Sequence, residues 1–493
     1  MVDVLLVNPP SPDGEVYIRD INRSGRRSRE RTIWPQTSLA YLAAMLRDKY
    51  SVGIIDCIAE EMAWPKFKSY IEKQKPKYVI INVITSVVSN DLYTAYLGKF
   101  LGATTIAIGP HVTSLPIETL EKFPVLDYAI LGEAELTIKE LIDICEDNGS
   151  LDKVKGIAFR KKGEIKINEK RPLIENLDDL PIPLHELLPI KKHKLPFIGK
   201  NYTFVLSSRG CPYSCTFCRQ PIMWERRVRS RSAENIMIEL RKIKELGIKN
   251  FIFHSDTFTI NKRLVMELCQ KMIEEDLNLS WCCNSRVDTI DEEMLALMKR
   301  AGCWMIAFGI ETASQEILNN VKKEATVEQA IKAVKVTKEA GIAVWAYFVF
   351  GLPGESKETI TKSIKLAKKL PVDIANFAIG APYPGTEFYQ QAKNNSWLIS
   401  DNWEDFDQNY SAIVSYEKFS AKEIKNSIKK AYREWYLRPM TIIRLLTQKN
   451  ILQYLGVLAK VGVYHLFWRQ ENRTKKSLHH FVTVGIIKLL SCF

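Results

Sequence analysis

The chain has 493 residues, of which 46% are hydrophobic and 26% charged, and its formal net charge is +13. This composition is that of a globular protein of roughly two to four domains, and it excludes a disordered, collagen-like or disulfide-scaffold chain. The ten cysteines are widely spaced and the chain shows no secretory leader pattern, so we predict a cytoplasmic protein with reduced thiols. No uncharged apolar run reaches about 18 residues, so we expect no membrane-spanning helix.

Residues 1–147 alternate short apolar runs with helical periods, which predicts a doubly wound α/β domain with a parallel sheet covered on both faces. The expected strands are Val2–Val7, Val52–Asp56, Tyr78–Ile84, Thr104–Ile108 and Asp127–Leu131. Such sheets bind ligands beyond the carboxyl ends of their strands. The candidate binding residues at those ends are Asn8, Thr85, Ser86, Gly109, His111, Gly132 and Glu133.

A basic segment interrupts this pattern between Arg19 and Arg31, where six Arg stand against two acidic residues. It could close over a site, contact anionic groups or be solvated. Residues 148–200 then hold a hairpin pattern, Gly156–Arg160 and Glu164–Ile167, and a linker that contains prolines. We place a domain boundary in this segment.

Residues 201–404 resume the alternation of strands and helices, with longer helices. Strands are expected at Thr203–Ser207, Asn250–His254, Leu279–Asn284, Trp304–Gly309, Val344–Phe350 and Ile374–Ile379. Six strand–helix units cannot close the usual eight-stranded barrel, so we expect a partial, open barrel. Its lateral gap would admit a large substrate.

Residues 405–493 are helical, apolar and basic, without further strand patterns. From Ala421 to Phe493, 14 Lys and Arg stand against three Glu. This tail could cap the barrel, form a solvated face or lie in a membrane interface. The chain shows no helix-turn-helix, RNA-recognition or zinc-finger pattern, so no DNA partner is expected.

Three cysteines, Cys211, Cys215 and Cys218, follow the first barrel strand in a C-x3-C-x2-C run. This end of a barrel carries the active site in such folds, and three thiols can surround one soft metal centre. A structural zinc site needs four ligands, and no nearby Cys or His completes that set. A 4Fe-4S cube held by three thiolates keeps one iron open, which favours a catalytic site.

This run resembles the signature of the radical S-adenosylmethionine (radical SAM) superfamily. The resemblance implies that SAM binds the open iron and that a low-potential electron donor triggers its cleavage to a radical that abstracts hydrogen from the substrate. Residues 308–312 (F-G-I-E-T) and 350–355 (F-G-L-P-G-E) resemble two further family segments. The SAM contacts that the family implies are Phe217, near the adenine, and Asp256, Arg286, Glu311, Gly351 and Pro353. A helix N-terminal charge at Glu311 and a plain turn at Gly351 stay open.

The domain ahead of the barrel resembles the flavodoxin-like domain of the cobalamin-dependent radical SAM branch, and residues 109–113 (G-P-H-V-T) match a loop common there. The resemblance therefore implies cobalamin as a further cofactor. The D-x-H-x-x-G signature of a cobalt-ligating histidine is absent, because Gly109 and Ser114 replace its Asp and Gly. We expect His111 to be a loop or cofactor-edge residue.

Together these resemblances imply methylation of an unactivated carbon in a lipid-like or other apolar substrate. The basic tail suggests that this substrate is membrane-derived and that the chain contacts the membrane peripherally. The family also contains anaerobic tetrapyrrole cyclases and hopanoid-lipid methylases, so radical ring formation is the alternative. A nucleic-acid modifier and a non-catalytic cobalamin sensor also stay open, although the first lacks an RNA-binding domain and the second has no need of an open iron.

Overall fold

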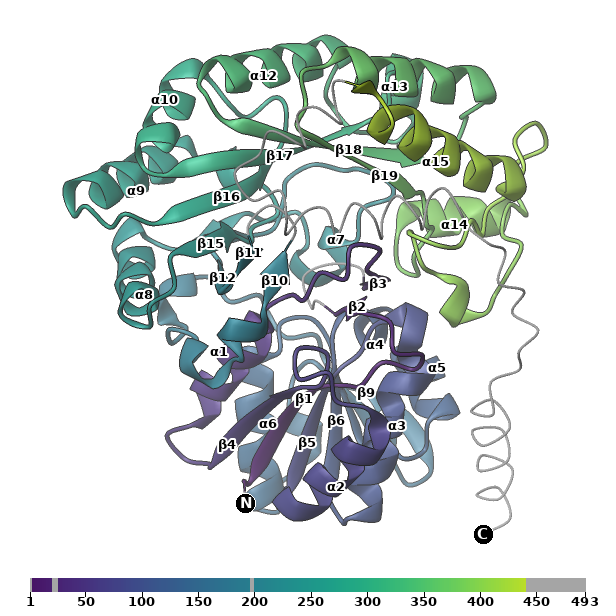
Figure 1. The fold of residues 1–493 in the computed structure, drawn as a ribbon. Coiled ribbons are helices and arrows are strands. Elements are labelled where there is room, and N and C mark those ends of the chain that lie inside the picture. Colours follow the sequence, from purple (N-terminus) through teal and green to yellow (C-terminus); the bar gives the residue numbers. More distant parts are fainter. Residues whose placement is uncertain (1, 20–24, 196–198, 440–493) are drawn as a thin grey trace.

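The computed structural model describes residues 2–19, 25–195 and 199–439. Figure 1 shows the amino-terminal sheet with its helices as one unit and the barrel as a second unit stacked against it. The strands of the first sheet point their carboxyl ends toward the barrel. Within the described ranges, no helix has the length and apolar character needed to cross a membrane.

The first sheet has the strand order β4-β1-β5-β6-β7-β8-β9, and its first five strands are parallel. The order of those five is that of a flavodoxin-like doubly wound sheet, as predicted. The strands are β1 (Val4–Asn8), β4 (Val52–Asp56), β5 (Tyr78–Asn82), β6 (Thr104–Ile108) and β7 (Tyr128–Ile130). All residues of β1 and β5 are buried, because helices cover both faces.

Two layers of helices cover this sheet. The helices α1 (Thr37–Leu46) and α6 (Glu135–Glu146) pack into the hydrophobic core on one face. The helices α2 (Trp64–Gln74), α3 (Val88–Phe100) and α5 (Pro116–Lys122) pack on the other. The short α4 (Pro110–Ser114) stands at the carboxyl edge, after β6.

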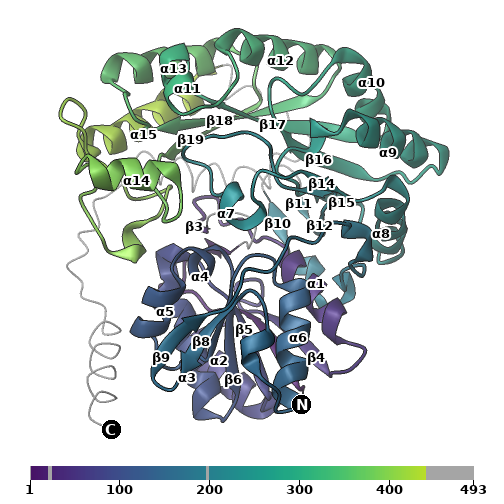
Figure 2. The same cartoon turned by 180° about the vertical axis from the view of Figure 1, so that it is seen from behind.

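The predicted hairpin is present as β8 (Ile157–Lys161) and β9 (Glu164–Ile167), which pair antiparallel. Its turn residues Lys162 and Gly163 both have positive φ, the geometry of a tight two-residue hairpin turn. The structure adds a connection that the sequence did not predict, because β8 pairs with β7 and extends the first sheet (Figure 2). Short 3-10 turns then lead to the barrel.

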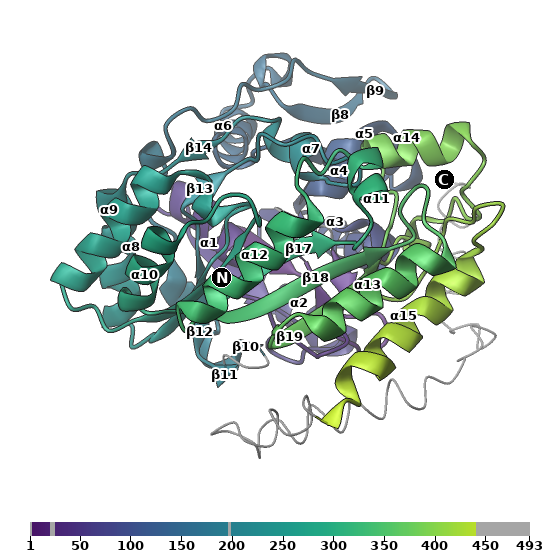
Figure 3. The ribbon, with the colours of Figure 1, turned by 90° about the horizontal axis from the view of Figure 1, so that it is seen from above.

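The second sheet is the predicted partial barrel, six parallel strands in the order β12-β15-β16-β17-β18-β19. They are β12 (Tyr202–Val205), β15 (Asn250–Phe253), β16 (Ser280–Ser285), β17 (Cys303–Glu311), β18 (Ala343–Phe350) and β19 (Ile374–Ile379). Their helices lie outside (Figure 3): α8 (Ala233–Glu245), α9 (Lys262–Glu274), α10 (Glu292–Arg300), α12 (Val327–Glu339) and α13 (Lys357–Lys369). A side-chain cap begins each of these helices.

Smaller elements complete the barrel unit. The strands β13 (Ser208–Arg209) and β14 (Arg229–Ser230) pair antiparallel, and α7 (Gln220–Trp224) lies between them in the sequence. A second short pair consists of β10 (Lys194–Leu195) and β11 (Gly199–Lys200). The helices α11 (Gln315–Asn320), α14 (Glu387–Asn394) and α15 (Ala421–Tyr436) complete the set. The tail segment for which we predict a membrane contact, residues 440–493, lies outside the described residues.

The described residues of the basic segment between Arg19 and Arg31 contact both units. The strand β2 (Tyr17–Ile18), just before the segment, and β3 (Arg26–Arg27), within it, lie between the units in Figure 1. Arg19 forms a fully buried ion pair with Asp91, at 2.7 Å. Arg29 donates hydrogen bonds to backbone carbonyls of the barrel unit, at Phe377 and Asn409.

Candidate active site

The cysteine loop begins directly after β13, at the carboxyl end of the barrel. Gly210 opens the loop with φ of +88°, and a Cβ at this position would lie 2.0 Å from the carbonyl oxygen of Arg227. Only glycine therefore fits here. The backbone N–H of Gly210 donates to Asp256 Oδ2 at 2.8 Å. Asp256, predicted to contact SAM, thus borders the cysteine loop.

The three cysteines of the loop are half-buried, free thiols. Burial, followed by the charges of the Cys215 thiolate and other neighbours, raises the pKa of Cys218 to about 12. Burial also raises the pKa of Cys211, and Asp256 and Cys215 add to that shift. The thiols therefore lie close enough to oppose one another's ionisation, and a metal that binds them must displace their protons.

The donor set suits a cluster better than a single ion. In the part of the chain that the structure describes, no three Cys, His, Asp or Glu side chains surround one point as a single ion requires. An iron–sulfur cube takes each thiolate on a different iron, so its cysteines need not meet at one point. Cys211, Cys215 and Cys218 supply the three thiolates that a cube with one open iron takes.

Two buried cations stand beside this donor set. Arg286 and Lys323 both interact electrostatically with Cys215. Arg286 donates to both carboxylate oxygens of Asp288, at 2.9 Å each, and its guanidinium lies 3.3 Å from the centre of the Tyr213 ring. Positive charge at this place stabilises the thiolates and, through them, an anionic cluster.

Glu311 ends β17 in a strained conformation, with φ of +65°. Its Oε1 accepts from Lys323 Nζ at 2.6 Å, and both side chains are buried. A Cβ at Gly309 would lie 2.4 Å from that same oxygen. Because residue 309 is a glycine, there is room beside it for the Glu311 carboxylate and for its ion pair with Lys323. This buried ion pair gives Glu311 a contact other than a helix N-terminus.

The glycine–proline turn after β18 packs beside the cysteine loop. Leu352 belongs to a small apolar cluster against which Phe217 packs, so the turn and the predicted adenine neighbour Phe217 border the same cluster. Gly351 has φ of +92° and its carbonyl accepts from the hydroxyl of Tyr416 at 2.8 Å. Pro353 follows, half-exposed. Glu355 accepts the backbone N–H groups of Gly351 and Leu352, and its burial raises its pKa to about 8.

At the carboxyl edge of the first sheet, Gly109 has φ of +112° and a Cβ there would lie 2.9 Å from the carbonyl oxygen of Val83. His111 is buried, and burial lowers its pKa to about 3. Its two ring nitrogens contact the hydroxyls of Thr85 and Thr119, at 3.2 Å each. Both ring nitrogens of His111 are thus engaged by hydroxyl groups of the sheet domain.

Ser86 lies on the same edge, and its buried hydroxyl has no hydrogen-bond partner in the described part of the chain. A polar ligand over the edge would supply one. Asn8, by contrast, donates to Asp56 Oδ1 at 2.6 Å, so its amide is held within the sheet domain. The glycine at 109 lets this loop pack against the backbone of Val83, and the hydroxyl of Ser86, unpartnered within the described ranges, fits a polar cofactor at the edge.

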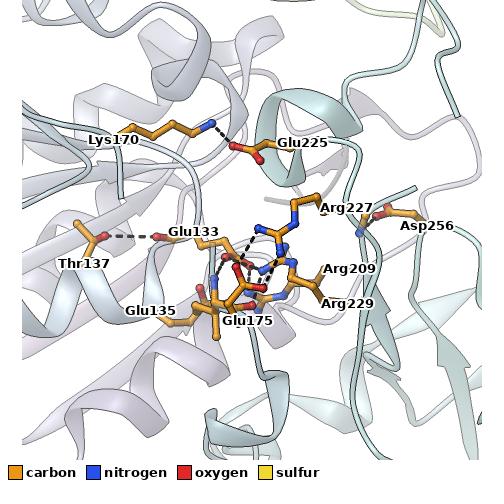
Figure 4. A network of polar contacts seen from close by, with 12 residues as sticks. Glu133, Glu135, Thr137, Lys170, Glu175, Arg209, Glu225, Arg227, Arg229 and Asp256 are labelled. Carbon is orange, nitrogen blue, oxygen red and sulfur yellow. Dashed lines mark hydrogen bonds and ion pairs between the residues drawn. The ribbon is translucent and has the colours of Figure 1, made fainter. Parts of the chain in front are cut away.

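Glu133 has contacts other than the predicted ones, as Figure 4 shows. Its carboxylate accepts from Arg209, at 2.8 Å, and from Arg229, and Arg209 also pairs with Glu135. All four side chains are buried. This ion-pair cluster ties the strand before the cysteine loop to the sheet domain. Gly132, its neighbour, has φ of +76°.

A cavity lies between the two units beside this ion-pair cluster. The sheet domain lines it with residues around Gln36 and Gly132. The barrel unit lines it with the aromatic and apolar side chains of Phe204, Leu206, Met223 and Trp224, and with Arg209 and His254. Residues at the carboxyl edges of both sheets therefore border one cavity.

Comparison with known proteins agrees with this architecture. Residues 205–367 match the radical SAM superfamily, and residues 29–142 match the B12 binding domain. An uncharacterised methyltransferase of Pyrococcus horikoshii is 35% identical over 94% of this chain and 97% of its own length. An anaerobic magnesium-protoporphyrin IX monomethyl ester cyclase of Rubrivivax gelatinosus is 28% identical over 82% of this chain and 74% of its own.

A solved structure shares the fold. The cobalamin-dependent S-adenosylmethionine radical enzyme OxsB, with aqua-cobalamin and SAM bound, superposes with a TM-score of 0.71 at 16% identity, over 99% of this chain and 75% of its own. The chain therefore belongs to the radical SAM enzymes that carry a B12-binding domain. The family uses a 4Fe-4S cluster, SAM and cobalamin, which agrees with the predicted cofactors.

Several residues of the site were not predicted from the sequence. Lys323 and Asp288 contact predicted residues but lie outside any motif. Arg209 is next to the motif, and Arg219 follows its last cysteine directly. Their basic character was visible, yet only the fold shows that both are buried.

Proposed function

We propose that this protein is a cobalamin-dependent C-methyltransferase that acts on an unactivated carbon of a largely apolar substrate. One observation carries the proposal: the cavity between the units is lined by Gly132 and Glu133 at the edge of the sheet domain and by Arg209, two residues before Cys211. A substrate placed there would lie between the sheet domain and the strand that leads into the cysteine loop. When bound, the cluster with SAM supplies hydrogen abstraction, and cobalamin supplies a methyl group.

The chain's own residues would position these groups. Cys211, Cys215 and Cys218 would hold the cluster, and the buried cations Arg286 and Lys323 would balance its charge. The predicted SAM contacts Asp256 and Glu311 lie at the ends of β15 and β17, the strands on either side of β16. Packed apolar walls would exclude water from the reactive carbon.

The sheet-domain edge would hold cobalamin without a histidine ligand. Gly109 lets the loop after β6 pack against Val83, and Ser86 offers a hydroxyl that has no partner among the described residues. His111 would support the edge from below through its bonds to Thr85 and Thr119. The name of the Pyrococcus relative supports methyl transfer.

An apolar substrate is supported by the cavity wall. Four apolar or aromatic side chains, Phe204, Leu206, Met223 and Trp224, line the side contributed by the barrel unit, together with Arg209 and His254. We further propose a cytosolic protein that contacts anionic membranes through residues 440–493. Salt-sensitive binding to anionic vesicles, lost when those residues are deleted, tests that contact, and unchanged binding after deletion rejects it.

The reaction is tested by anaerobic reconstitution with iron, sulfide and cobalamin, followed by SAM, a low-potential reductant and an extract of candidate lipids. Methyl transfer predicts S-adenosylhomocysteine and 5′-deoxyadenosine together. 5′-Deoxyadenosine alone would instead favour ring formation, the reaction class named for the Rubrivivax relative. The Cys215→Ala variant should give neither product.

A further inference from the structure

Arg219, the residue after the last cluster cysteine, has an environment unlike that of the other buried arginines. Its side chain is buried, and Nε, Nη1 and Nη2 all lack a hydrogen-bond partner in the described part of the chain. Arg209, Arg229 and Arg286 each bond to at least one carboxylate. A buried guanidinium without any acceptor is costly and calls for a ligand.

The contacts that Arg219 does make do not neutralise it. The guanidinium lies 4.8 Å from the centre of the Tyr383 ring. Apart from burial, Tyr383 and Cys218 are the groups that shape its electrostatics, and no carboxylate is among them. Stacking on a ring leaves the five N–H donors free in the ring plane. Among the described residues the charge of Arg219 is therefore unpaired, and its N–H donors remain available.

The Arg219 side chain lies where the sheet domain and the barrel unit contact each other. Arg219 interacts electrostatically with His111 of the sheet domain, as does Lys122. The helices α4 and α7, which carry or adjoin these residues, pack against each other. Of the cluster cysteines, only the adjacent Cys218 acts on Arg219, whereas Arg286 and Lys323 lie near Cys215. Two other buried cations, Arg286 and Lys323, therefore already interact with a cysteine of the loop.

We propose that Arg219 is an oxyanion-binding residue that takes a carboxylate or phosphate group of the ligand held between the two units. The planar guanidinium fork matches two oxygens of such a group. This inference rests on the proposed function, and it adds an acidic group to the substrate class: an apolar body with an anionic end. The oxyanion has two sources, the substrate or the phosphodiester of cobalamin's nucleotide.

The first test uses inorganic phosphate as the probe and thermal unfolding of the anaerobically reconstituted full chain as the readout. Phosphate, compared with chloride at equal ionic strength, should raise the melting temperature of the wild type. Arg219→Met should weaken phosphate binding by about tenfold or more. Arg219→Lys, which keeps the charge but not the fork, should fall between them.

The matched control is Arg226→Met, because Arg226 lies nearby on the surface and is exposed. It should respond to phosphate as the wild type does. Without phosphate, Arg219→Met should melt at or above the wild-type temperature, since it removes an unpaired buried charge. Equal phosphate responses in all variants would overturn the proposal. Loss of iron from Arg219→Met would also overturn it, because Arg219 would then serve the cluster.

The second test separates the two sources. Equilibrium dialysis compares cobalamin with cobinamide, which lacks the nucleotide and its phosphate. If Arg219→Met weakens cobalamin binding alone, the nucleotide supplies the oxyanion; if it weakens neither, the substrate does. Equal weakening of both would overturn the proposal, because the residue would then serve the corrin ring. Phosphate binding through Arg219 with no S-adenosylhomocysteine formed would reject the proposed function and leave this inference standing.

Discussion

The buried carboxyl group of Glu355 should make the stability of this protein depend on pH. Its Oε2 accepts two backbone N–H groups of the turn after β18, while Oε1 has no partner in the described residues. Burial dominates, and the pKa rises from 4.5 to about 8. The folded state thus holds a proton that the unfolded state releases near pH 4.5.

The direction and size of the effect follow from this difference. Because the folded chain binds the proton more tightly, the free energy of unfolding falls as the pH rises between about 4.5 and 8. The slope approaches about 1.4 kcal/mol per pH unit. Between pH 6 and pH 8.5 the side chain should therefore contribute a loss of about 2.5 kcal/mol.

The assay compares urea unfolding of the wild type and Glu355→Gln at these two pH values. The variant should lack this part of the pH dependence, so the difference in unfolding free energy between the proteins should change by about 2.5 kcal/mol. Glu328→Gln, at an exposed glutamate in the first turn of α12, is the control. Parallel pH profiles for wild type and Glu355→Gln would refute the reasoning.

Four further predictions address the site. Glu133→Ala strips Arg229 of its buried carboxylate and should lower the unfolding free energy by about 3 kcal/mol; an unchanged urea midpoint would contradict this. Cys215→Ala should lose its iron, measured by chelation, yet keep its cobalamin affinity, and retained iron would count against the cluster assignment. The electron paramagnetic resonance (EPR) spectrum of bound cob(II)alamin should show no nitrogen splitting from His111; splitting that disappears in His111→Ala would prove it a ligand. Gly309→Ala crowds the Glu311 carboxylate and should weaken SAM binding in equilibrium dialysis, whereas unchanged affinity would separate that pair from SAM.

The sheets could be predicted because their strands are buried on both faces and read as continuous apolar runs. β4, β6 and β19 begin and end where the sequence placed them. The ends of the other barrel strands differ from the predicted ends by a few residues at most, because the polar residues at strand ends interrupt the apolar pattern. The hairpin could be predicted from its turn, but its pairing with β7 depends on a neighbour that local pattern does not encode.

The site was predictable where residue type and spacing alone fix the chemistry, as for the cysteine loop. Partners from distant parts of the chain were not predictable. Glu133 lies at a strand end, where a cofactor ligand is expected, yet its carboxylate pairs with two arginines that lie about 80 to 100 residues further along the chain. Arg19 of the basic segment illustrates the same point, because its ion pair with Asp91 forms only in the folded chain.

The central claim is that three thiols hold a cluster whose open iron binds SAM. The most direct measurement is the EPR spectrum of the reduced, anaerobically reconstituted protein with and without SAM. The account predicts a cluster signal that changes when SAM is added and that is absent from Cys215→Ala. A protein that takes up no iron, or a cluster signal that SAM leaves unchanged, would contradict it.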